Sequence, residues 1–225
     1  IRYKLVTGVQ TCALPILHGV PIMFNDENCT GIIGEEPDTL MMRDTALSKT
    51  LGDPGSHPTM DAMTIGGVRV PFSNFVKLGK DWCQIRVQGN NEAINVRPID
   101  PASAPSGTIT LKWNGPAPMK PRSLVVREIT GFKGAYFDVM SNPKGVEVPA
   151  GEDELLYGRF VSGKGSTAKS GILLKGDSKS FKVEGGKTAT IELGAPFAIE
   201  FVVKKDGTKA TVDGVSTWVK GKAGE

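Results

Sequence analysis

The residues best able to do chemistry in this sequence form an acidic loop near its start. Oxygen-bearing side chains recur on alternate residues at Asp26, Asn28 and Thr30, and Gly31 follows them directly. Residues 17–60 contain seven acidic and two basic side chains, so negative charge is concentrated in this part of the chain. Carboxylate, amide and hydroxyl oxygens are the ligands that the hard cation Ca²⁺ prefers. The loop is therefore a candidate calcium site.

This spacing resembles the calcium loops of EF-hand and dockerin modules. In those loops the first, third and fifth side chains bind the ion, a glycine at the sixth position makes the turn, and the seventh residue offers its carbonyl. The sequence departs from the pattern at the twelfth position, where Pro37 replaces the bidentate glutamate. We therefore expect weak binding, with a Kd of about 10⁻⁴ to 10⁻³ M. The predicted ligands are Asp26, Asn28, Thr30, the carbonyl of Ile32, Glu36 and Asp38.

The same loop allows simpler interpretations. A plain β-turn would use Asp26 and Asn28 to cap its own backbone, with the other acids in solvent. The tripeptide Asn28-Cys29-Thr30 also fits the N-glycosylation acceptor pattern. Cys29 could pair with Cys83 in an oxidising compartment, whereas Cys83 alone fits a small buried side chain on the apolar side of a strand. The sequence leaves these alternatives open.

No other segment carries a recognisable catalytic constellation. Residues 158–166 differ from a phosphate-binding P-loop at Gly165, because the magnesium ligand Ser or Thr should follow the lysine there. His18 and His57 are far apart in sequence, and no serine or cysteine lies in a nucleophile-elbow context. The sequence therefore predicts neither enzymatic activity nor a bound nucleotide.

The amino-acid composition argues against several further classes of function. The 225-residue chain contains 27 basic and 24 acidic residues, a balance that argues against a nucleic-acid partner. Two histidines and three cysteines exclude a zinc cluster or a disulfide-dense scaffold. The chain has no run of eighteen apolar residues, so we expect no insertion into a membrane.

The elements that position the loop are predicted to be strands. Apolar and polar residues alternate in several segments, the pattern of strands with one face on a core and one in water. Turn dipeptides such as Asp206-Gly207 and Asp213-Gly214 recur about every ten residues. We predict an all-β fold: an antiparallel β-sandwich of the Ig-like or transthyretin-like type, with a smaller N-terminal β-rich domain. The clearest alternating segments are residues 83–87, 109–113, 188–193 and 197–203.

A proline-rich stretch suggests a domain boundary. Residues 98–107 contain three prolines, which resist ladder pairing. We predict a β-rich domain with the acidic loop at residues 17–100, a linker at 101–105 and a β-sandwich domain at 106–225. Residues 6–16 are identical to a translated sequencing adapter, so we interpret residues 1–16 as a non-native segment. The chain is then expected to be a metagenomic fragment of a larger protein.

Part of the second unit resembles a known family of domains. Residues 148–158 and 181–193 resemble the turn, strand and hairpin phrases of carboxypeptidase-regulatory-like and transthyretin-like β-sandwich modules in secreted bacterial proteins. The resemblance covers roughly residues 120–205. It implies a non-catalytic structural or binding module in a larger extracytoplasmic bacterial protein, stabilised by calcium if the acidic loop binds it.

Two alternative functions follow from other features. Aromatic residues on a flat sheet face would make a carbohydrate-binding accessory module. The chain could also be an accessory region of an enzyme whose catalytic domain lies elsewhere. Expected partners are thus carbohydrate or other domains of the same polypeptide. The candidate sugar-stacking residues are Trp82, Trp113, Tyr136, Tyr157 and Trp218.

Overall fold

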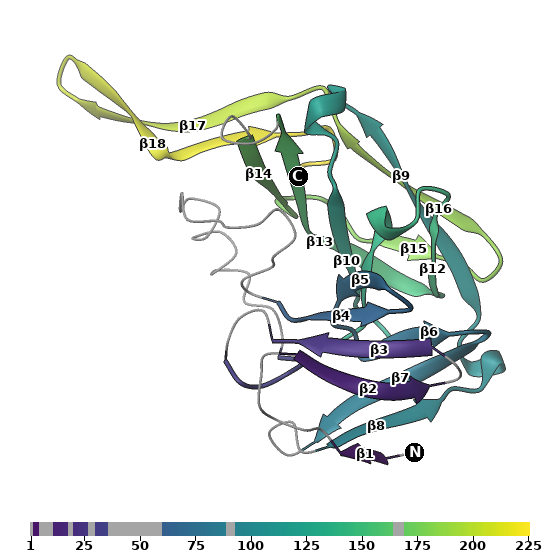
Figure 1. The fold of residues 1–225 in the computed structure, drawn as a ribbon. Helices are drawn as coiled ribbons and strands as arrows, with labels where there is room; N and C mark the ends of the chain where they lie inside the picture. The colour runs from purple at the N-terminus through teal and green to yellow at the C-terminus, as the bar shows by residue number, and fades with distance from the viewer. Residues whose placement is uncertain are drawn as a thin grey trace.

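The protein is built of β-strands (Figure 1). The computed structural model describes residues 2–4, 11–17, 20–26, 30–35, 60–88, 93–163 and 169–225. Within these ranges the chain forms strands and short 3-10 turns and no α-helix, which confirms the all-β prediction. None of the described residues belongs to a helix with the length and apolar composition that crossing a bilayer demands.

The N-terminal part contains two four-stranded sheets that supply one hydrophobic core. Side chains of both sheets meet in a single buried cluster, in which the rings of Phe24 and Phe72 lie 5.8 Å apart. Cys83 and Ile85 are fully buried in this cluster, as the alternation of that segment predicts. One sheet contains, in spatial order, β2 (Thr11–Leu17), β3 (Val20–Asn25), β4 (Ala62–Ile65) and β5 (Val68–Pro71). The other contains β1 (Arg2–Lys4), β8 (Ala93–Pro98), β7 (Asp81–Gln88) and β6 (Phe75–Leu78).

Two further sheets share a second core. β16 runs parallel to β9, whereas the other strand pairs of the described residues are antiparallel. Inward side chains of both sheets, including Ile109 and Val126, belong to the same buried cluster. The larger sheet contains β11 (Tyr136–Asp138), β10 (Ser123–Glu128), β13 (Gly151–Ser162) and β14 (Lys169–Leu174), with β15 (Phe181–Val183) beside β13. The smaller contains β12 (Val146–Pro149), β9 (Ser106–Asn114) and β16 (Thr188–Gly194).

The N-terminal sheets also contribute to the second core. The ring of Phe75 contacts that of Phe132 edge-on, with centroids 5.0 Å apart. Trp82 contacts Phe137 at 5.9 Å, and its indole N–H donates to the Ser106 hydroxyl at 2.7 Å. Aromatic pairs of this kind stabilise a contact beyond their burial alone. The two parts therefore pack against each other through aromatic side chains.

The boundaries drawn from the sequence stay predictions. The predicted linker contains a 3-10 turn, Pro101–Ser103, whose first turn is capped by the Asp100 carboxylate, and β9 begins at Ser106. The segment interpreted as non-native contributes β1 and most of β2, which pair with β8 and β3. These pairings place the backbone of that segment in the sheets and leave its origin a prediction.

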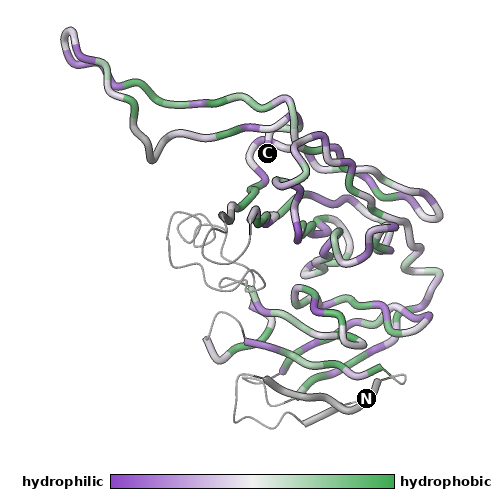
Figure 2. The backbone as a smooth tube through the Cα atoms, turned by 45° about the horizontal axis from the view of Figure 1, so that its top comes forward, coloured by the Kyte–Doolittle hydropathy of each residue, from purple (hydrophilic) through white to green (hydrophobic). Residues whose placement is uncertain are grey.

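The C-terminal strands form a hairpin that projects from the rest of the molecule, which we call the arm (Figures 1 and 2). The arm consists of β17 (Ala198–Asp206) and β18 (Lys209–Lys220), paired only with each other. The sequence predicted a half-buried strand over residues 197–203, and this is wrong: every residue of β17 is exposed. The reason is that β17 and β18 contribute no side chain to the core clusters found among the described residues.

The turn predicted at Asp213-Gly214 is also absent, because β18 continues through both residues. In the pairing register, Phe201 lies opposite Thr217 but Val203 lies opposite Val212. Residues 213–216 therefore form an irregularity within the strand. At this glycine-containing dipeptide, where the sequence predicted a reversal of the chain, four residues of β18 face a single residue of β17.

Candidate functional site

The described half of the acidic loop is held by its own hydrogen bonds. Asp26 accepts from the backbone N–H groups of Thr30 and Gly31, at 3.2 and 2.7 Å. The Thr30 hydroxyl donates to the Glu35 carboxylate at 2.7 Å, and the Ile32 N–H donates to the Thr30 oxygen at 3.3 Å. Three predicted ligands thus lie close together, joined by Glu35, which the sequence interpretation did not include.

The rest of the predicted calcium site cannot be placed. Asn28, Glu36 and Asp38 lie outside the described residues. Within the described ranges, no three His, Cys, Asp or Glu side chains gather in a way that could hold a metal ion. The capping role of Asp26 is typical of a plain turn, and calcium in this loop stays a prediction. Cys83 is a free, buried thiol, and Cys29 also lies outside the described residues.

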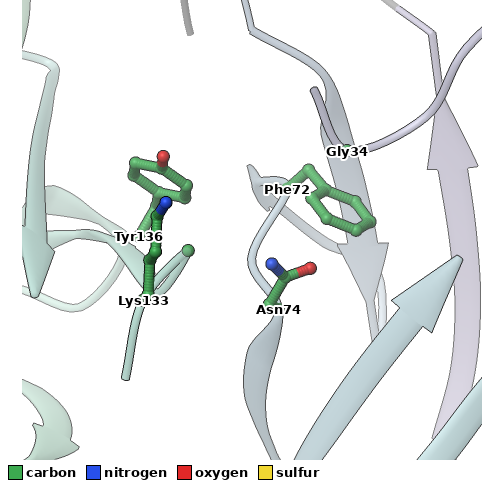
Figure 3. Close-up of a pocket in the computed structure, with 6 residues that line it drawn as sticks. Gly34, Phe72, Asn74, Lys133 and Tyr136 are labelled. Atoms are coloured by element: carbon green, nitrogen blue, oxygen red, sulfur yellow. The ribbon is translucent and has the colours of Figure 1, made fainter. Parts of the chain in front are cut away.

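A small pocket opens between the N-terminal sheets and the turn that precedes β11 (Figure 3). Phe72 and Asn74, from the segment between β5 and β6, lie on one side, and Lys133 and Tyr136 lie on the other (Figure 3). Its volume is about 140 Å³. A cavity of about 150 Å³ accommodates one benzene ring, so this pocket has room for a single ring-sized group. The lining residues are Gly34, Phe72, Asn74, Lys133, Gly134 and Tyr136.

Two glycines shape the pocket walls. Gly34 and Gly134 have φ angles of +89° and +82°, a region that side chains rarely adopt. A Cβ atom on Gly34 would lie 2.6 Å from the Phe72 ring, and one on Gly134 would overlap the side-chain nitrogen of Asn74. The Gly34 N–H donates to the buried Asp61 carboxylate at 2.7 Å, which fixes this wall. The pocket therefore depends on close approach of side chains to a bare backbone.

The chemistry of the lining suits binding. Phe72 is 3% exposed and Tyr136 is 8% exposed, so both rings are held by the protein around them. Aromatic rings offer an apolar surface, and the Asn74 amide can both donate and accept hydrogen bonds. The Lys133 ammonium adds a charged donor at the exposed side. This set contains no nucleophile with an adjacent base, so it can hold a ligand by contact and hydrogen bonds.

A second cluster, which the sequence interpretation missed, is a pair of buried carboxyl groups. Glu128 and Asp153 lie directly opposite each other on β10 and β13, with exposures of 3% and 0%. Burial raises the pKa of Glu128, but hydrogen bonds from Thr130, Gly131 and Phe132 outweigh it and bring the pKa below its ordinary value. Glu128 is therefore a carboxylate that caps the turn after β10.

The pKa of Asp153 is shifted in the opposite direction to that of Glu128. Neither of its carboxyl oxygens has a hydrogen-bond partner. Burial, with the nearby negative charge of Glu128, raises the pKa of Asp153 to about 7. Since Asp153 is fully buried and does not line the pocket, the pair has no access to a substrate. Glu128 alone holds the turn that carries Phe132 and Lys133. The sequence signal of the buried pair was the run of three acids at residues 152–154.

The aromatic residues predicted to form a sugar-stacking face do not share one face. Trp82 and Tyr157 are buried in different core clusters. The Trp113 indole donates to the Pro116 carbonyl at 3.2 Å, and its ring contacts Phe197 at the base of the arm. Trp218 lies on the arm itself. Among the predicted set, Tyr136 alone lines the pocket.

Comparison with known proteins identifies no relative. No family model matches the chain, and neither the curated proteins nor the solved structures give a match. The likeness of residues 120–205 to secreted bacterial modules, and that of the acidic loop to calcium loops, therefore stay predictions.

Proposed function

We propose that the chain is a non-catalytic binding module of a larger extracytoplasmic protein. Its framework is proposed to be a β-sandwich of the Ig-like or transthyretin-like type. The contribution of two sheets to one buried cluster supports a sandwich. The resemblance of residues 148–158 and 181–193 to modules of secreted bacterial proteins supports the location.

The pocket is the observation that carries this proposal. Its volume of about 140 Å³ has room for part of a sugar residue, and its lining contains two aromatic side chains, an amide and an ammonium group. A sugar residue presents hydroxyl groups to the amide and the lysine, and apolar C–H groups to the small exposed part of the Phe72 and Tyr136 rings. We therefore propose that the ligand is a single sugar residue, free or at the end of a glycan.

A titration with defined sugars tests this proposal. The probes are glucose, galactose, mannose, N-acetylglucosamine and their β-1,4-linked trimers, followed by amide NMR spectra. We expect shift changes at Gly34, Asn74 and Gly134, with affinity about tenfold lower in Asn74→Ala and Lys133→Ala, a loss of about 1.4 kcal/mol each. The matched control Lys144→Ala removes an exposed lysine outside the pocket and should leave affinity unchanged. Shifts located elsewhere, or no shift with any probe, would refute the sugar site.

A second candidate function is a purely structural accessory module that docks onto other parts of its polypeptide or onto an attached enzyme. The projecting arm favours this candidate, because it exposes several large apolar side chains, as interaction surfaces typically do. Examples are Ile199, Phe201 and Val219. In that case none of the sugar probes binds, and removal of the arm's apolar side chains abolishes assembly.

A further inference from the structure

The arm is fixed at its base. The Lys220 ammonium pairs with Asp177 at 2.7 Å and with Glu200 at 3.0 Å. The Lys222 N–H donates to the carbonyl of Gly194, the last residue of β16, at 2.7 Å. The ring contact between Trp113 and Phe197 lies beside these bonds. These contacts hold both strands of the hairpin where they leave the smaller sheet.

Cross-strand pairing defines two faces of the arm near its base. Ile199 lies opposite Val219, and Glu200 lies opposite Trp218. Because neighbouring residues of a strand point to opposite sides, Glu200, Trp218 and Lys220 share one face. Lys220 pairs with Asp177, so this face is directed toward the rest of the molecule. The other face, which we call the outer face, carries Ile199, Phe201 and Val219.

The outer face is apolar and open to solvent. Ile199, Phe201 and Val219 are 66%, 53% and 60% exposed. The next cross-strand pair, Val203 and Val212, is 42% and 52% exposed. An isolated two-stranded hairpin is only marginally stable in water, so a long hairpin with this composition requires a covering surface. Contiguous apolar patches of this kind mark sites of association.

We propose that the outer face packs against the same face of a second copy of this chain, giving a two-fold symmetric dimer. The area fits: the apolar side chains of the outer face and of the next pair, which are 42% to 66% exposed, present on the order of 450 Å². A standard interface buries about 800 Å² per partner, and somewhat more than half of that area is apolar. A two-fold contact must be self-complementary, and the three side chains of the outer face carry no charge that would repel its copy.

The charges of the arm tip set the orientation of the two arms. The tip contains Lys204, Lys205 and Lys209 with a single acid, Asp206. Parallel arms would bring two positive tips together, whereas antiparallel arms place each tip at the opposite end of the interface. The dimer is therefore antiparallel, with Phe201 near the middle of the contact.

Sedimentation equilibrium of the whole chain tests this inference. We expect the apparent mass to rise from 23.9 kDa toward twice that value as concentration increases from about 1 to about 200 µM. Phe201→Lys and Ile199→Lys should each remain monomeric over this range, because they place a like charge on both sides of the contact. Lys209→Glu, at the tip and outside the outer face, is the matched control and should still dimerise.

Two further measurements separate a lost interface from a lost fold. If the melting temperature of the lysine variants is unchanged, the substitutions affect the arm and leave the rest of the fold intact. Val219→Lys takes the place of any variant that fails to fold. Phe201→Lys mixed with Phe201→Glu should restore the dimer, since opposite charges then meet in one interface. A wild-type chain that stays monomeric, or a dimer that survives all the lysine variants, overturns the proposal. The sugar titration involves none of these residues, so the two proposals can fail separately.

Discussion

Strands β16 and β17 follow one another in the chain and have the same alternating sequence pattern. The apolar side chains of β16 are nevertheless buried, whereas those of β17 are exposed to solvent. In β16, Ile191 and Leu193 are 9% and 1% exposed, because the strand lies beside β9 and faces the second core. In β17, Ile199 and Phe201 are 66% and 53% exposed. Alternation therefore predicts which side of a strand needs a partner, and it does not say whether this chain or another molecule supplies it.

The largest difference between the two strands should appear on truncation to alanine. We expect Leu193→Ala to lower the free energy of unfolding by about 4 kcal/mol, since it leaves a cavity in a packed core. Ile199→Ala at the same low protein concentration should lower it by less than about 0.5 kcal/mol. Urea titrations of both variants measure this contrast. Equal losses would show that the arm is already packed within one chain.

The buried carboxyl group of Asp153 should make the free energy of unfolding depend on pH. Its pKa of about 7 in the fold lies above the ordinary value of 3.8, so the folded state binds the extra proton between these values. With respect to this group, stability is then highest below about pH 4, and it falls by about 4 kcal/mol as the pH rises from 4 to 8. Asp153→Asn should remove this decline and be more stable than the wild type at pH 8.

The matched control for this pH dependence lies on the arm. Asp206→Asn removes an exposed carboxyl group at the tip, and its unfolding free energy should follow the wild-type pH profile. A wild-type profile that is flat from pH 4 to pH 8 would contradict the burial of an unpartnered acid at position 153.

Two glycines with positive φ angles allow a finer comparison of the two regions. Gly207 in the arm turn has open space around a Cβ atom, whereas a Cβ atom on Gly134 would overlap Asn74. Both alanine variants strain the backbone by about 1 kcal/mol. Gly134→Ala should cost about 1 kcal/mol more and weaken binding in the pocket. Thermal melts of the pair measure the difference, and equal melting temperatures would argue against a tight wall at Gly134.

Calcium should give the smallest effect. At a Kd of about 10⁻³ M, 5 mM Ca²⁺ stabilises the fold by about 1 kcal/mol. For a chain of this size the melting temperature would rise by about 2 to 4 °C, and Asp26→Ala should abolish the response. Identical melting curves in calcium and in chelator would leave the acidic loop as a plain turn.

The sequence predicted individual strands and turns better than the contacts between segments that are far apart in the chain. The strands around Cys83, Ile109 and Ile191 follow directly from alternation, and the hairpin reversal lies next to Asp206-Gly207 as predicted. The parallel contact of β16 with β9 joins segments about eighty residues apart and has no local signal. A strand irregularity and a hairpin turn can contain the same dipeptide, Asp213-Gly214, so only the pairing with the opposite strand distinguishes them.

The pocket shows why a site can be invisible in sequence. Its walls come from three separated stretches: Gly34, residues 72–74 and residues 133–136. No spacing rule connects them, because they meet through the packing of Phe75 on Phe132. The acidic loop, by contrast, was visible as a motif since all its members are neighbours in the chain.

Two of the three tryptophans lie where each can act as an optical reporter of a different event. Trp82 is 5% exposed and lies where the N-terminal sheets contact the second core, so separation of the two parts would shift its emission toward longer wavelength. Trp218, on the arm, is 39% exposed and should be quenched by iodide in a free arm. Variants that keep a single indole would therefore follow the separation of these two parts and the docking of the arm independently, in unlabelled protein.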